Sequence, residues 1–173
     1  MQPWLIVIIV IAGIYLSLLI VNIIFIISFY VIMNKHNRAF KIILKSKLDS
    51  IKELAKKMSA VWGMEINNEY THLLDESQNM LNEKDFLKDC DTVKKNLSYI
   101  NNDLSSMCEE NEEVKNDDEY ILIEENIKQL DSVYRTNVIM YNADVLGYNY
   151  WIRFLPFRYL WLLFRLKLKD FIS

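Results

Sequence analysis

The amino-acid sequence predicts an all-α protein, with an N-terminal transmembrane helix, an antiparallel bundle of three to four helices and an amphipathic C-terminal helix. Residues 4–33 contain no charged side chain. Beyond them, apolar residues recur three and four positions apart, which is the period of a helix with one buried face. Glycine and proline, which sheets and turn-rich folds need, occur after residue 33 only at Gly63, Gly147 and Pro156.

The first predicted segment, residues 1–33, is a transmembrane anchor. As a helix, residues 4–33 would be about 45 Å long, against a bilayer hydrocarbon core of about 30 Å. A cleaved signal peptide would need a basic start, a shorter apolar core and a small-residue cleavage site, and these are missing. Basic and titratable residues follow the apolar stretch, which predicts a single-pass protein of the cell membrane with its N-terminus outside and its bundle cytoplasmic. These residues are Lys35, His36, Arg38, Lys41, Lys45 and Lys47.

Asn22 is the polar exception inside this anchor. A polar residue in hydrocarbon favours a hydrogen-bonding partner, often on another helix. Asn22 therefore predicts either self-association of the chain through this residue or a single polar side chain that the long apolar helix tolerates.

The second predicted segment, residues 34–152, is the helical bundle, with seams like those of a coiled coil. The first helix ends near Gly63, and a second begins near Ile66. The pattern loses phase at residues 82–85, so residues 66–110 form either two helices, capped by Asn82 or Asp85, or one helix with a stutter. An antiparallel path that returns the tail to the membrane favours two.

An acidic stretch, residues 109–119, predicts a solvated turn before a long last helix of residues 118–151. The predicted buried positions are Ile43, Leu44, Leu48, Ile51, Leu54, Ala55, Met58, Val61 and Trp62 in the first helix; Tyr70, Leu73, Leu74, Met80 and Leu81 in the second; Phe86, Cys90, Val93, Leu97, Ile100, Leu104 and Met107 in the third; and Tyr120, Ile123, Ile127, Leu130, Tyr134, Val138, Tyr141, Val145, Tyr148 and Ile152 in the last.

The two cysteines, Cys90 and Cys108, lie on one predicted helix, too far apart to form a disulfide. Two free thiols suit a reducing compartment, which agrees with a cytoplasmic bundle. The formal net charge is −3, with an acidic middle and basic flanks. This distribution does not suggest a nucleic-acid partner.

The last predicted helix and the residues after it resemble the closing signature of the LemA family. The resemblance consists of two Tyr-Asn pairs seven residues apart, followed by Phe and Pro. An Asp on the first bundle helix also matches, whereas Lys52 and Glu112 stand where the family usually has proline. The resemblance implies a membrane-anchored helical bundle with no established reaction. The matching residues are Asp49, Arg135, Tyr141, Asn142, Val145, Tyr148, Asn149, Phe154 and Pro156.

Three of these residues, Arg135, Asn142 and Asn149, recur every seven positions and border the tyrosine seam. We expect them to be partly buried, and buried polar groups need partners. Asp49 is the candidate partner of Arg135. The set predicts either polar contacts that hold the helices in register or, as the alternative, a groove for a ligand or partner.

No catalytic or metal site is predicted. Glu69, His72 and Glu76 have a Glu-x-x-His spacing like half of a di-metal site, but a second such motif is missing. Because the three residues lie off the apolar seam, a solvated helix face is the expected interpretation. We expect no cofactor and no enzymatic activity, since no nucleophile–base arrangement is found.

The third predicted segment, residues 153–173, is an amphipathic basic and aromatic tail at the membrane interface. Aromatic and cationic side chains on opposite faces are typical of a helix lying on anionic lipid. The alternative is a tail that packs on its own bundle. The interface residues are Arg153, Phe157, Arg158, Trp161, Phe164, Arg165, Lys167 and Lys169.

These features predict a LemA-like, single-pass, non-enzymatic scaffold or partner-recruiting module. Its expected partners are the lipid bilayer and a membrane or cytoplasmic protein whose identity the sequence does not give. The alternative function is a ligand- or metal-responsive membrane sensor. The acidic stretch would be the surface most available to a basic partner.

Overall fold

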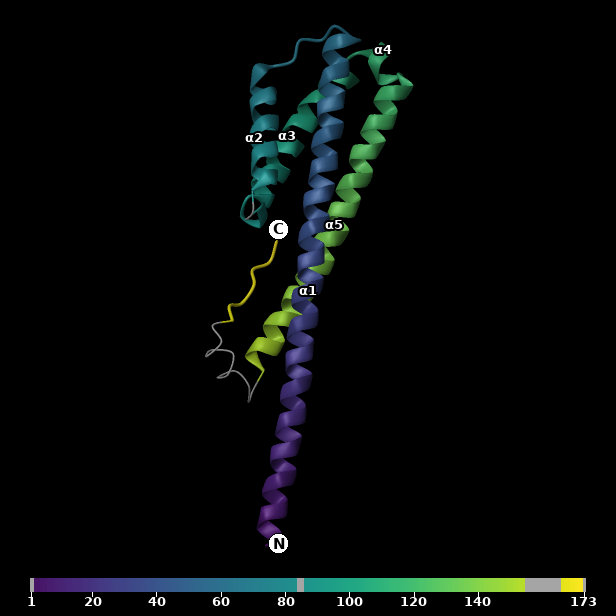
Figure 1. Ribbon diagram of the computed structural model, residues 1–173. Helices are drawn as coiled ribbons and strands as arrows, with labels where there is room; N and C mark the ends of the chain where they lie inside the picture. Colours follow the sequence, from purple (N-terminus) through teal and green to yellow (C-terminus); the bar gives the residue numbers. More distant parts are fainter. Residues whose placement is uncertain (1, 84–85, 155–165, 173) are drawn as a thin grey trace. The chain divides into compact units, whose positions relative to one another are not determined.

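The computed structural model describes residues 2–83, 86–154 and 166–172. These residues form α1 (Pro3–Ala60), α2 (Asn68–Asn82), a 3-10 turn η1 (Phe86–Lys88), α3 (Cys90–Glu109), α4 (Glu112–Lys115) and α5 (Asp118–Arg153). No strand occurs within the described residues. The predicted all-α class is therefore confirmed (Figure 1).

Helix α1 is a single helix of 58 residues that continues from the apolar stretch into the first bundle seam. Pro3 stands at its first position, where a missing N–H costs no helical hydrogen bond. The helix ends at Ala60, and Gly63 follows with a φ of 64°, a left-handed conformation that glycine adopts without strain. The predicted end near Gly63 is thus confirmed.

Residues 66–110 form two helices rather than one. Helix α2 begins with Asn67 as N-cap, whose side chain accepts a hydrogen bond from the N–H of Glu69. Asn82 is the last residue of α2, and the residue before α3 is Asp89, so the expectation that Asn82 would cap the next helix is wrong. Asp85, the other candidate, lies outside the described residues. Helices α2 and α3 lie against each other as a hairpin (Figure 1).

The acidic stretch before α5 contains one helical turn, α4, and buries Val114. Asn111 caps this turn by accepting from the N–H groups of Glu113 and Val114. Asp117 is half-buried, and the other six acidic side chains remain exposed, as predicted for a solvated segment. They are Glu109, Glu110, Glu112, Glu113, Asp118 and Glu119, the acidic tip.

The chain divides into two compact units. Unit 1 contains the described residues of Met1–His36 and Ile139–Ile172, and unit 2 contains the described residues of Asn37–Val138. The two units do not coincide with the predicted ranges 1–33, 34–152 and 153–173. The apolar part of α1 groups with the end of α5 and with the C-terminal segment in unit 1.

The predicted seams of unit 2 are largely buried. Leu48, Ile51, Leu54, Leu97 and Ile100 are at most 2 % exposed. Val61 is wrongly predicted to be buried: it is 67 % exposed, because it follows the last helical residue of α1. Burial of each of these side chains stabilises the folded chain by roughly 1.5–3 kcal/mol. The periodic apolar residues therefore stabilise the bundle.

Candidate functional site

Two asparagines on α5 hold the main chain of the C-terminal segment in unit 1. The side-chain amide of Asn142 donates to the carbonyl oxygen of Ile172 at 2.8 Å and accepts from its N–H at 3.0 Å. Asn149 does the same with Lys169, with both hydrogen bonds at 2.9 Å. Each amide therefore pairs both the N–H and the C=O group of one residue. We call Asn142 and Asn149 the asparagine ladder.

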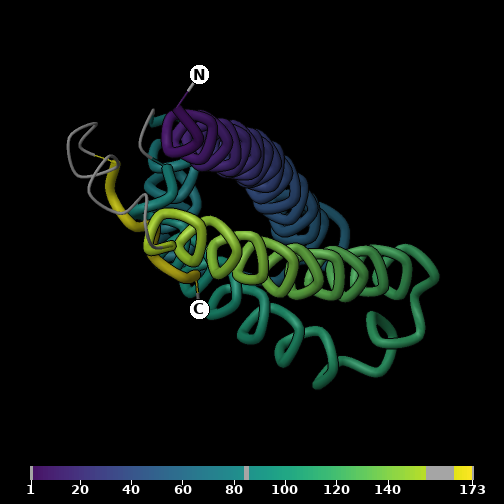
Figure 2. Tube along the Cα trace, turned by 90° about the horizontal axis from the view of Figure 1, so that it is seen from below, coloured from purple at the N-terminus to yellow at the C-terminus, as the bar shows by residue number. Residues whose placement is uncertain are grey.

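The spacing of the ladder matches an extended peptide. Seven helical residues separate its two amides by about 10.5 Å. The two residues that it holds are three apart, and in a chain of polyproline II type residues three apart face the same way at a distance of about 9.3 Å. Residues 166–172 have no helical turn, and Figure 2 shows this yellow segment beside the last turns of α5.

The predicted helical form of the tail is therefore wrong for residues 166–172. Main-chain groups that a helix would pair internally are paired with the asparagine ladder instead. These residues pack on the chain itself, which is the alternative that the sequence allowed. Residues 155–165, with the predicted interface residues Phe157, Arg158, Trp161, Phe164 and Arg165, lie outside the described residues, as does Pro156.

Contacts with α1 hold the same end of α5 within unit 1. The Asn22 Nδ2 donates to the carbonyl oxygen of Trp151 at 3.3 Å. The rings of Phe25 and Trp151 stack, with centroids 4.6 Å apart and planes inclined by 4°. Gly147 permits close approach, because a Cβ atom there would lie 2.6 Å from the ring of Phe29.

Charged groups add to this interface. His36 Nε2 lies 3.3 Å from an Asp144 carboxylate oxygen, and both side chains are largely buried. The Lys169 ammonium lies 5.8 Å from the ring centroid of Tyr30, a cation–π contact between the C-terminal segment and α1. Unit 1 is thus a three-part assembly of α1, α5 and residues 166–172.

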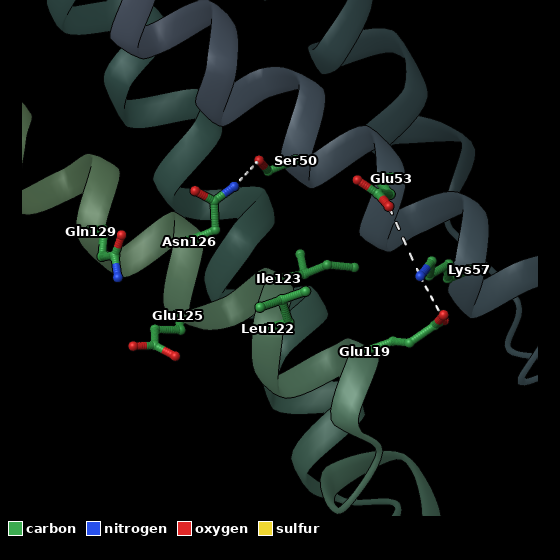
Figure 3. Close-up of a pocket in the computed structure, with 9 residues that line it drawn as sticks. All are labelled: Ser50, Glu53, Lys57, Glu119, Leu122, Ile123, Glu125, Asn126 and Gln129. Atoms are coloured by element: carbon green, nitrogen blue, oxygen red, sulfur yellow. Dashed lines mark hydrogen bonds and ion pairs between the residues drawn. The ribbon is translucent and has the colours of Figure 1, made fainter.

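An open groove of about 470 Å³ lies between α1 and α5 in unit 2 (Figure 3). At one end the Lys57 ammonium bridges Glu53 at 3.9 Å and Glu119 at 2.6 Å. At the other, Asn126 donates to the hydroxyl of Ser50 at 3.0 Å. The hydrogen bond to Glu119 raises the pKa of Lys57 above its ordinary value. The groove is lined by Ser50, Glu53, Lys57, Glu119, Leu122, Ile123, Glu125, Asn126 and Gln129.

A second ion pair between α1 and α5 in unit 2 also joins residues other than the predicted ones. Lys47 is buried and its ammonium lies 2.6 Å from a carboxylate oxygen of Asp131. Asp49 and Arg135 are both exposed, so the predicted buried pairing between them is not formed. The sequence placed Lys47 among the basic residues next to the membrane and at a position that matches the LemA family, but its pattern did not indicate Asp131 as its partner.

The remaining signature residues lie as their pattern suggests. Tyr141, Val145 and Tyr148 are buried. Phe154 is half-buried against the rings of Tyr150 and Trp151. Arg153, Lys167 and Lys169 are exposed, and their predicted contact with lipid stays a prediction.

Both cysteines are free and buried. The Cys90 sulfur lies 3.3 Å from the hydroxyl oxygen of Tyr134. Burial raises the pKa of Cys90, and it raises the pKa of Cys108 to about 11. The two thiols are therefore poor nucleophiles at neutral pH.

Glu69, His72 and Glu76 occupy the outer part of α2, where Glu69 and His72 are exposed and Glu76 is half-buried. Within the described residues no group of three or more His, Cys, Asp and Glu side chains has a geometry suited to a metal ion. Comparison with models of known families, with curated proteins and with solved structures finds no match for this chain.

Proposed function

We propose that this protein is a membrane-anchored, non-enzymatic scaffold of the LemA type that recruits a protein partner through its helical bundle. The membrane anchor is supported by the exposed N-terminal part of α1. Of residues 4–21, all but Leu19 are exposed in the fold. This 18-residue stretch is about 27 Å long, close to the hydrocarbon thickness of a bilayer. Such an apolar surface in water would aggregate, and lipid is the partner that fits it.

The residues just beyond the exposed stretch suit a membrane boundary. Asn22 is the first buried residue of α1. Its Nδ2, a donor that hydrocarbon would leave unpaired, donates to the carbonyl oxygen of Trp151, whereas its buried Oδ1 has no hydrogen-bond partner among the described residues. Aromatic side chains gather here, as they do at membrane–water interfaces. They are Phe25, Tyr30, Tyr150, Trp151 and Phe154.

A cysteine scan of exposed α1 positions tests the proposed span. Ile8, Ile11 and Ile32 are all more than 40 % exposed in the fold, so protection of a thiol at these positions must come from lipid. We expect a water-soluble maleimide, applied to open membrane fragments, to label Ile32→Cys and to leave Ile8→Cys and Ile11→Cys unlabelled until detergent is added. Equal labelling of all three without detergent would contradict the span.

The acidic tip supports the recruiting role. Its six exposed carboxylates adjoin the groove of Figure 3 through Glu119. Glu125 adds an exposed carboxylate to the groove, where Lys57 pairs with Glu53 and Glu119. An excess of charge of one sign on a surface, here the carboxylates of the acidic tip, attracts a partner of the other sign and raises the rate of association. The partner class that this surface favours is a basic protein segment.

A photo-crosslinking amino acid at Glu113 tests this role in native membranes. A matched control places it at Lys95, which is exposed on α3 and outside the acidic tip. We expect Glu113 to give discrete crosslinked species that weaken as salt rises. Identical products from both positions would contradict recruitment through the tip.

A further inference from the structure

The asparagine ladder has the properties of a peptide-binding site. It makes four hydrogen bonds to main-chain atoms of Lys169 and Ile172. Asp170 and Phe171, which lie between Lys169 and Ile172, have exposed side chains. The ladder thus recognises the spacing and direction of an extended main chain, and side chains contribute little to its hydrogen bonds.

We propose that the asparagine ladder is a binding site for an extended C-terminal segment, and that residues 166–172 of a second copy of this chain can replace the chain's own. The chain's own segment is then a built-in occupant that blocks the site. A second copy supplies a segment of identical sequence, so it can make the same four hydrogen bonds. The inference goes beyond the proposed function, because a scaffold need not exchange its C-terminal segment, and it does not depend on the membrane span.

The balance between the two occupants follows from effective concentration. A tethered segment competes at a local concentration in the millimolar range, whereas a free segment competes at its own concentration. The full chain should therefore bind an added segment weakly, and a chain that ends after Arg165 should bind it well. Chains held in one membrane are concentrated in two dimensions, which favours exchange between copies.

The test uses a fluorescent peptide with the sequence of residues 166–173. The chain that ends after Arg165 is placed in nanodiscs of zwitterionic lipid, and empty nanodiscs serve as the blank. To check that the shortened chain folds, its thermal unfolding is compared with that of the full chain. We expect saturable binding, measured by fluorescence anisotropy, and at least about tenfold weaker binding to the full chain, whose own segment competes at millimolar effective concentration.

Changes in the peptide test main-chain recognition without altering the protein. Methylation of the main-chain nitrogen of Lys169 or Ile172 removes a donor to the ladder, and each lost hydrogen bond should weaken binding about fivefold. The same methylation at Phe171, for which no such hydrogen bond is seen, is the matched control and should leave affinity unchanged within about twofold.

Changes in the protein give the complementary evidence. Asn142→Ala combined with Asn149→Ala should weaken peptide binding at least tenfold, by the loss of four hydrogen bonds. Thr136→Ala, on the same helix, removes an exposed hydroxyl that donates to the carbonyl of Ser132 and should leave binding unchanged. The proposal is overturned if the shortened chain unfolds like the full chain yet does not bind the peptide. It is overturned equally if methylation at Phe171 weakens binding as much as methylation at Ile172.

Discussion

The side chain of Asn22 caps the C-terminal end of α5: its Nδ2 donates to the main-chain oxygen of Trp151, 129 residues away in the sequence, at 3.3 Å. Helix α5 ends at Arg153, so the carbonyl of Trp151 belongs to the last turn, where it also accepts from the N–H of Phe154 at 3.4 Å. The polar residue in the apolar helix thus gives this main-chain oxygen a second donor, from a neighbouring helix. Its partner is in the same chain, whereas the sequence left open self-association or a single tolerated polar side chain.

Asn22→Ala should therefore destabilise the full chain in detergent. The loss of this buried hydrogen bond should lower the free energy of unfolding by about 1 kcal/mol. Ser17→Ala is the matched control, because the Ser17 hydroxyl donates only to the carbonyl of Gly13 on its own helix and is exposed. Equal midpoints of thermal unfolding for the two variants would contradict a capping role for Asn22.

Helical periodicity made most of unit 2 predictable from the sequence. In a helix with one buried face, buried positions recur about every 3.6 residues, whichever element covers that face. Residues such as Leu97, Ile127 and Tyr134 were therefore placed correctly. The phase slip at residues 82–85 likewise marked a real break, since η1 lies between α2 and α3.

Contacts between distant residues, within unit 1 and within unit 2, were not predictable in the same way. Periodicity shows which face is buried but not which distant residue covers it, and the Asn22–Trp151 and Lys47–Asp131 contacts join residues 129 and 84 positions apart. The apolar and basic pattern of residues 166–172 suits a helix. The ladder overrides that pattern because it pairs the N–H and C=O groups of Lys169 and Ile172 directly. The one usable signal was the seven-residue spacing of Asn142 and Asn149.

The tyrosine seam of α5 supplies a second stability prediction. Tyr141 is 4 % exposed, whereas Tyr150 on the same helix is 59 % exposed. Tyr141→Ala should lower the free energy of unfolding by about 3–5 kcal/mol, the range for truncating a buried aromatic side chain. Tyr150→Ala should cost less than about 1 kcal/mol, as an exposed substitution usually does. Denaturant unfolding of both full-length variants measures the difference, and similar losses would show that the seam is wrongly phased.

Alkaline pH should destabilise unit 2. Burial raises the pKa of Cys108 to about 11 and that of Tyr120 to about 12, from ordinary values of 9.0 and 10.0. Burial also raises the pKa of Cys90 and Tyr134. Above pH 9 the unfolded chain loses these protons before the folded chain does, so the free energy of unfolding falls as pH rises.

The denaturation midpoint should thus be stable between pH 7 and about 8.5, and fall progressively through about pH 11. Cys108→Ala removes one of the groups whose pKa is raised in the folded chain. Between about pH 9 and 11, the denaturation midpoint of this variant should fall less steeply than that of the unsubstituted chain. A midpoint independent of pH over this range would show that the folded thiols and phenols titrate normally.

Gly147 should be intolerant of a side chain, despite its place inside a helix. Alanine at a helical glycine ordinarily gains about 1 kcal/mol. Here the added Cβ would lie 2.6 Å from the Phe29 ring, and overpacking of this kind costs about 1–3 kcal/mol. We expect Gly147→Ala to lower the melting temperature of the full chain, and the combination with Phe29→Ala to remove that additional loss. An additive double variant would show that the ring moves aside freely.

Orientation in the membrane gives the last prediction. The basic residues after residue 33 favour a cytoplasmic bundle and an external N-terminus. Cys90 and Cys108 are buried and have raised pKa values, so an impermeant maleimide should label the unsubstituted chain poorly at neutral pH. In intact cells it should label Gln2→Cys, and it should reach Asn116→Cys, exposed beside α4, only after permeabilisation. Labelling of Asn116→Cys but not Gln2→Cys in intact cells would reverse the assigned orientation, and it would place the acidic tip outside the cell.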